Sequence, residues 1–92
     1  METSFGTLEP LLKHNNQVIT ELAVFEKEGR SHSHDTWEIC YVLEGKGAIM
    51  EGEKKHFVKE GDTVHIPPKT RHWMIPEGEP KLKILIVYSS QK

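Results

Sequence analysis

The sequence predicts an all-β protein made of short antiparallel strands. Segments rich in β-branched and aromatic residues recur along the 92-residue chain, and turns that contain glycine or proline separate them. These turns come about every 8 to 12 residues, a spacing typical of an antiparallel sandwich or barrel. Helical periodicity is nearly absent, so all-β is the expected fold class.

Each expected strand stops at a recognisable turn. Residues 37–43 end at a Glu-Gly-Lys-Gly cluster, and residues 63–66 end at Pro67-Pro68, which can neither donate to a β-ladder nor continue a helix. Only residues 8–14 have the character of a helical turn, and Pro10 keeps that turn short. The seven expected strands are residues 18–25, 37–43, 48–50, 56–58, 63–66, 72–75 and 82–88.

Composition excludes several classes of protein. Hydrophobic residues make up 36% and charged residues 28%, which is a globular composition, and the formal net charge of −2 argues against a nucleic-acid partner. The longest apolar runs, residues 39–43 and 84–88, are far shorter than the roughly 20 residues of a membrane span. No signal peptide is visible, and one cysteine forms no intrachain disulfide, so we expect a cytoplasmic protein.

Two histidines and a glutamate are spaced so that they share one face of a strand. His32 and His34 lie two positions apart, and Glu38 follows at the same parity. Cys40 and Val42 continue this face. Buried imidazoles and carboxylates must be paired, neutralised or bound to metal, and a divalent cation accepts both donor types. From this segment alone, a metal site and an exposed polar edge are equally open.

A second segment carries a turn at Gly61, a strand, the corner at Pro67 and then His72. Together the two segments resemble the paired motifs of the cupin superfamily. In the first motif His32, His34, Glu38 and Gly45 fall at the family's spacing, and in the second Gly61, Pro67 and His72 do. The resemblance covers about residues 18–88.

Three positions depart from the family's motifs. Glu26 and Lys69 replace glycines, and Pro76 replaces an asparagine. None of the three is a metal ligand in the family, so the resemblance leaves the ligand set intact. Lys69 bears on the backbone of the corner, because glycine there would permit a positive φ.

The resemblance implies a jelly-roll β-barrel, also called a double-stranded β-helix, with residues 1–92 as one cupin domain. Motif one spans about residues 26–45 and motif two about residues 61–76. It further implies that the barrel holds one divalent transition metal through His32, His34, Glu38 and His72. Mixed nitrogen and oxygen ligation suits Fe, Mn, Ni, Co, Cu or Zn. The alternative is a degenerate cupin whose pocket is empty.

Three histidines and a carboxylate leave open positions on a five- or six-coordinate ion, as catalytic sites do. We therefore expect a metal-dependent enzyme of the oxygenase, isomerase or epimerase, or lyase type, acting on a small molecule. Glu38 would be a ligand and a candidate proton acceptor. The competing hypothesis is a non-catalytic module that binds or senses a small ligand through the same metal.

Other polar residues are weaker candidates. Cys40 should lie inside, where a buried structural role is more common than a catalytic thiol. Lys69 and Arg71 flank the proline corner and would attract an anion if it rims the pocket, although solvated loop charges look the same in a sequence. His56 and His65 are expected at the surface.

Trp37, Ile39, Tyr41 and Leu43 occupy the face of their strand opposite the expected ligands, yet all four are apolar. A strand whose outer face is wet would alternate apolar and polar residues. Little of a 92-residue chain is left to cover this face, so we expect a homodimer built on it.

Overall fold

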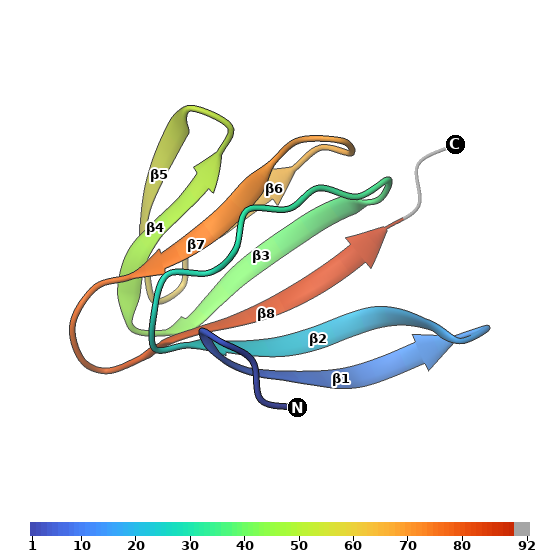
Figure 1. Cartoon of the computed structure of the whole chain (residues 1–92), viewed down its shortest axis with the longest axis horizontal. Coiled ribbons are helices and arrows are strands. Elements are labelled where there is room, and N and C mark those ends of the chain that lie inside the picture. Colours follow the sequence, from blue (N-terminus) through green and yellow to red (C-terminus); the bar gives the residue numbers. More distant parts are fainter. Residues whose placement is uncertain (90–92) are drawn as a thin grey trace.

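The fold is all-β, as predicted. In the computed structural model, which describes residues 1–89, these residues form eight strands and no helix (Figure 1), so they include no helix that could cross a membrane. The strands are β1 (Gly6–His14), β2 (Gln17–Phe25), β3 (Trp37–Glu44), β4 (Lys46–Glu51), β5 (Lys54–Lys59), β6 (Thr63–Ile66), β7 (His72–Pro76) and β8 (Leu82–Ser89).

Two antiparallel sheets make up the jelly roll. The larger sheet has the strand order β1-β2-β8-β3-β6, and the smaller has the order β5-β4-β7. The buried core residues come from both sheets, among them Val42 and Ile84 of the larger sheet and Ile49 and Met74 of the smaller. The inner faces of the two sheets therefore enclose the core.

The core consists of side chains that alternate along the strands. On β3, Cys40 and Val42 are fully buried, while Tyr41 between them is 42% exposed. On the smaller sheet, Ile49 and Met74 are directly paired and both are buried. Each such apolar side chain stabilises the fold by about 1.5–3 kcal/mol relative to leaving it in water. The inner face of β3 therefore turns toward the smaller sheet, and the site described below lies between β3 and β7.

The expected helical turn at residues 8–14 is wrong. These residues belong to β1, which pairs antiparallel with β2 through a two-residue turn at Asn15 and Asn16. Both asparagines have positive φ, 51° and 65°, as a hairpin turn of this length requires and as asparagine tolerates. Pro10 is accommodated because β1 is an edge strand with an irregularity just after Pro10.

The outer face of the larger sheet carries a row of apolar side chains, as the apolar residues of β3 predicted. Directly paired side chains form a row across three strands, Leu22 on β2, Leu85 on β8 and Tyr41 on β3. Ile39 on β3 and Val87 on β8 form a second directly paired set next to this row. No described element covers this row, and Tyr41 is among the exposed large hydrophobic residues.

Candidate metal centre

Two strands and one connecting segment bring the four predicted ligands together. Glu38 comes from β3, and His72 begins β7. His32 and His34 lie in the segment between β2 and β3, which is not a regular strand. The predicted side chains do converge, but not through strand parity, because His32 and His34 lie outside a regular strand. A β-bridge between His32 and His72 joins their segment to β7.

Backbone hydrogen bonds hold the connecting segment against β7. The amide of Gly29 donates to the carbonyl of Met74 at 2.8 Å, and His32 and His72 exchange amide-to-carbonyl bonds at 3.1 and 2.9 Å. A further bond, from the amide of Lys69 to the carbonyl of His34 at 2.7 Å, ties the proline corner to the same segment. Both motif segments are thus joined through their main chains at the site.

The donor atoms of the four side chains lie close to one point. One donor atom from each of His32, His34, Glu38 and His72 lies within 4.8 Å of the other three. Nε2 of His34 and Nε2 of His72 donate to the same carboxylate oxygen, Oε1 of Glu38, at 2.9 and 3.1 Å. Glu38 and His72 are both 1% exposed, whereas His34 is 28% exposed. His32 is also exposed, so the cluster reaches solvent through the two histidines of the connecting segment.

Each histidine is oriented by a bond to its other ring nitrogen. Nδ1 of His32 donates to the carbonyl of Arg30 at 3.0 Å, and Nδ1 of His72 donates to the carbonyl of Thr70 at 2.8 Å. Nδ1 of His34 lies 3.1 Å from the hydroxyl of Thr36. A carbonyl only accepts, so the bonds of His32 and His72 place a proton on Nδ1. A metal ion would replace any proton on Nε2 and bind there, while the Nδ1 bond orients the ring, as in metal-binding histidines.

The electrostatics of the cluster favour an ionised carboxylate beside a protonated imidazole. Burial raises the pKa of Glu38, but the hydrogen bond and the charge of His72 outweigh it, so the pKa lies below its usual range. Burial lowers the pKa of His72, but the bond to Glu38 outweighs it and the pKa lies above its usual range. A divalent cation would displace the imidazole proton, because histidine binds metal in its neutral form, and the ionised Glu38 would remain as the anionic ligand.

The donor set fits such an ion. Transition-metal bonds to nitrogen and oxygen are about 2.0–2.2 Å long, so donors on opposite sides of one ion are about 4.2 Å apart. The widest separation among the four donor atoms is no more than 4.8 Å, which is close to that span. The residues present can therefore hold one metal ion with positions left for a further ligand.

A comparison with protein families decides the affiliation of this fold. The sequence profile of the cupin domain family matches residues 18–88, the stretch over which the motifs suggested the resemblance. The chain is a cupin. Among curated proteins, this cupin is 49% identical over 55 residues to an uncharacterized protein of Methanocaldococcus jannaschii. It is also 29% identical over 65 residues to acireductone dioxygenase of Methylococcus capsulatus.

These two matches involve 59% and 66% of this cupin but only 44% and 35% of the relatives, so the cupin spans less than half the length of either. A solved cupin-like protein of Thermotoga maritima, 27% identical, superposes with a TM-score of 0.79 over 97% of this chain and 78% of its own. A predicted oxalate decarboxylase from the same organism, 21% identical, gives a TM-score of 0.81 over 91% and 79%. The second likeness concerns the fold alone.

The cupin's departures from the family motifs are accommodated locally. Lys69 has a φ of 62°, the left-handed conformation that glycine would adopt at low cost. Glu26 forms a 2.7 Å ion pair with Lys81. Pro76 is the last residue of β7. The proline corner therefore keeps the expected geometry despite its lysine.

The remaining candidates lie outside the cluster. His65 is exposed on the outer face and packs on Trp37 with ring centroids 4.3 Å apart, as expected of a surface residue. His56 is partly buried and its Nε2 donates to Glu51 at 2.9 Å, so it is less exposed than predicted. Arg71 is exposed and donates to Ser31 at 2.9 Å.

Cys40 lies inside, as predicted, and its thiol donates to Oε2 of Glu38 at 3.2 Å. Burial raises the pKa of Cys40 far above its usual value, and the carboxylate of Glu38 raises it further. The thiol therefore keeps its proton, which argues against a thiolate nucleophile and for the structural role.

Sequence reasoning missed three residues that line a cavity beside the cluster, namely Glu21, Arg30 and Tyr88. The hydroxyl of Tyr88 donates to Glu21 at 2.7 Å, and its ring lies edge-on to His34. Strand parity carried a usable signal for two of them. Glu21 alternates with the core residue Ala23, and Tyr88 alternates with the core residue Ile86.

Proposed function

We propose that this cupin binds one divalent transition metal through His32, His34, Glu38 and His72 and acts as a metal-dependent enzyme on a small molecule. One observation carries the proposal. Four donor atoms converge within 4.8 Å, and hydrogen bonds on Nδ1 turn the imidazole Nε2 atoms of His32 and His72 toward them. Neither feature is needed for packing, because apolar residues of the same volume often stabilise a core as well as or better than buried charged groups.

A bound divalent ion would supply Lewis-acid or redox chemistry at its open positions. The chain's own residues have separate roles. Glu38 stays a carboxylate because its pKa is lowered, and Cys40 holds its second oxygen. Tyr88 keeps its phenolic proton, because burial and the nearby carboxylates of Glu38 and Glu21 raise its pKa. Its one proton is donated to Glu21, so the hydroxyl can accept a hydrogen bond from a ligand but does not serve as a base.

The relation to acireductone dioxygenase favours an enzyme of the oxygenase type among the classes open to a cupin. That match covers 66% of this chain at 29% identity, so the reaction is an inference from a partial likeness. Isomerases, epimerases and lyases remain the other classes that the same donor set serves.

A non-catalytic binding module is the second candidate, and one observation favours it. Both oxygens of Glu38 already accept hydrogen bonds, from two histidines and from Cys40, so the carboxylate has no unengaged oxygen to act as a proton acceptor. Turnover separates the two candidates. An enzyme consumes substrate or O₂, whereas a binding module shows saturable stabilisation by ligand without product.

Metal analysis of freshly purified protein tests the proposal. We expect about one equivalent of transition metal per chain, and after chelation a restored thermal shift on adding Zn²⁺, Mn²⁺ or Fe²⁺. His34→Ala should abolish this uptake, whereas His65→Ala, which removes an exposed histidine on the outer face, should leave it unchanged. Uptake by the His34→Ala variant equal to the wild type contradicts the proposal.

We also propose that two copies of the chain pack through the outer face of the larger sheet. The support is the uncovered apolar row formed by Leu22, Leu85 and Tyr41. A two-fold interface places the same patch on both subunits, so an apolar row buries itself against its own copy. The test of this assembly is given in the Discussion.

A further inference from the structure

A cavity of about 320 Å³ lies directly beside the metal centre, because His32 and Glu38 form part of its wall. This volume is at the lower end of the range of small-molecule sites. Anything bound in it therefore lies next to the four proposed ligands. The chemistry of the other walls defines what the cavity accepts.

Most of the wall is apolar. Phe5, Leu8, Phe25, Met74 and Ile86 line it. Phe5 and Phe25 stack with ring centroids 4.7 Å apart and an interplanar angle of 19°, so two aromatic side chains form a continuous part of the wall. Aromatic groups pair favourably with such side chains, either stacked or edge to face. The walls thus favour a ligand with a flat, apolar body rather than a sugar or a polyol.

One cation lines the cavity. Arg30 forms no ion pair with any carboxylate in residues 1–89, and its backbone carbonyl orients His32. The acidic lining residues are otherwise engaged, Glu21 with Tyr88 and Glu38 within the cluster. A guanidinium presents paired donors that match the two oxygens of a carboxylate.

The charges of the lining groups also favour an anion. Glu21 and Arg30 carry opposite charges, and a divalent ion beside Glu38 leaves one positive charge in excess. A monoanionic ligand neutralises this excess, and a neutral ligand does not. The apolar wall, the paired donors of Arg30 and the net charge therefore all favour an apolar molecule that carries one carboxylate.

Building on the proposed metal site, we infer that the cavity takes a small monocarboxylic acid with a flat apolar body. Arg30 binds the carboxylate, and Phe5 and Phe25 contact the body. The backbone carbonyl of Arg30 binds the ring of His32, so the main chain of Arg30 lies at the metal end of the cavity. Arg30 is thus the residue that selects the charge of the ligand.

Calorimetric titration of the zinc-loaded protein with three probes tests the inference. The probes are 3-phenylpropanoate, its neutral amide 3-phenylpropanamide, and propanoate, which has the charge but no flat body. We expect 3-phenylpropanoate to bind at least about tenfold more tightly than either of the others. The amide lacks the charged hydrogen-bonded pair with Arg30, and propanoate lacks the aromatic body.

Variants identify the groups responsible. Arg30→Gln should reduce the affinity for 3-phenylpropanoate to that for the amide, and Phe5→Ala should weaken both aromatic probes several-fold. The matched control is Arg71→Gln, because Arg71 is an exposed arginine that does not line the cavity. It should bind all three probes as the wild type does. Equal affinity of the wild type for acid and amide overturns the inference, as does an Arg30→Gln variant that keeps the preference for the acid.

The same titrations on the metal-free protein distinguish failure of this inference from failure of the metal site. Uptake of zinc without preference for the acid overturns only the ligand class. Arg30-dependent binding of the acid by a protein that takes up no metal overturns only the metal site. If neither zinc nor acid binds, both proposals fail.

Discussion

The thiol of Cys40 donates a hydrogen bond of 3.2 Å to Oε2 of Glu38, while Oε1 of the same carboxylate faces the histidines. The thiol therefore divides the carboxylate into an oxygen held by the protein and an oxygen available to a metal. Because burial raises the pKa of Cys40, this donor keeps its proton across the physiological range. Cys40 is thus a positioning residue for Glu38.

Replacing Cys40 tests that role. Cys40→Ser retains a donor and should keep zinc affinity and any activity within about tenfold, whereas Cys40→Ala removes the donor and should weaken zinc binding by about 10–100-fold. Competition with a chelator measures both. If the alanine and serine variants bind zinc equally well, the hydrogen bond does not position Glu38. A much larger loss of activity in a folded serine variant would promote the thiol to a catalytic role.

Removing His72 should separate metal binding from folding. The main-chain bonds between His32 and His72 do not depend on the side chain, and the apolar core closes the two sheets without it. Loss of a residue that only hydrogen-bonds to a metal ligand weakens metal binding by roughly 10–100-fold. We therefore expect His72→Ala, which removes a ligand itself, to lose more zinc affinity than this and to keep an unchanged far-UV circular dichroism spectrum. Unfolded His72→Ala protein would contradict this separation, and His65→Ala is the control that should bind normally.

Stability should depend on pH in opposite directions with and without metal. In the metal-free protein, Glu38 has a lowered pKa, so its contribution is present above about 4.5 and is lost as pH falls through the folded value. His72 has a raised pKa, so its contribution is full below about 6.5 and is lost as pH rises through the folded value. The pair therefore stabilises the metal-free chain most between these two pH values.

Metal binding has the reverse dependence, because imidazole must be neutral to act as a ligand. Zinc should be lost as pH drops through about 6, and the zinc-induced rise in Tm should grow between about pH 6 and 8. Thermal melts with zinc and with chelator across this range measure both curves. Constant metal occupancy down to pH 4 would indicate a different ligand set.

Much of this architecture follows from local sequence signals. Seven strands were expected and are present, because β-branched segments between glycine and proline turns leave few alternatives. β1 was missed because Pro10 reads as a strand breaker, and only its edge position and the Asn15-Asn16 turn make it compatible with a strand. Such compatibility depends on the tertiary neighbours, which the sequence does not display.

The candidate site divides in the same way. The ligands could be predicted from fixed motif spacing, although the bridge between His32 and His72, which brings them together, joins residues 40 positions apart. The place of Arg30 in the cavity wall could not be predicted, because a solvated loop arginine and a cavity arginine look alike in a sequence. Its role emerges only when the segment between β2 and β3 is laid against β7.

Lys69 holds a conformation that costs a side-chain-bearing residue about 1–2 kcal/mol. Glycine removes this cost but loses about 0.5–1 kcal/mol of its own through the greater freedom of the unfolded chain. Lys69→Gly should therefore raise the free energy of unfolding by about 0.5–1 kcal/mol in denaturant titration. The control is Lys27→Gly, at an exposed lysine without positive φ, which should lower it. A loss of stability in Lys69→Gly would show that the lysine side chain contributes contacts of its own.

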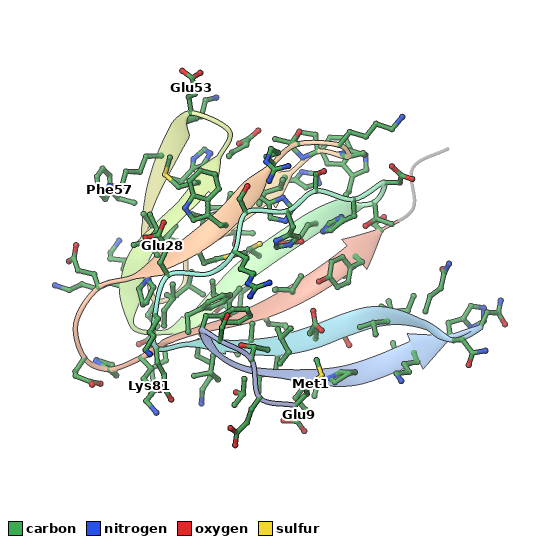
Figure 2. All side chains as sticks on the ribbon, viewed as in Figure 1. Met1, Glu9, Glu28, Glu53, Phe57 and Lys81 are labelled. Atoms are coloured by element: carbon green, nitrogen blue, oxygen red, sulfur yellow. The ribbon has the colours of Figure 1, made fainter. Side chains whose placement is uncertain are left out.

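The outer face of the larger sheet predicts the assembly state. Leu85 lies between Leu22 and Tyr41 in the uncovered row, so a charge placed there must be desolvated if two copies pack face to face. Sedimentation at micromolar concentration should give a dimer for the wild type and a monomer for Leu85→Glu. Phe57→Glu is the matched control, because Phe57 is 75% exposed on β5 and points away from both sheets (Figure 2). It should remain dimeric. A monomeric wild type removes the proposed interface, and loss of the dimer in Phe57→Glu alone would move it to the smaller sheet.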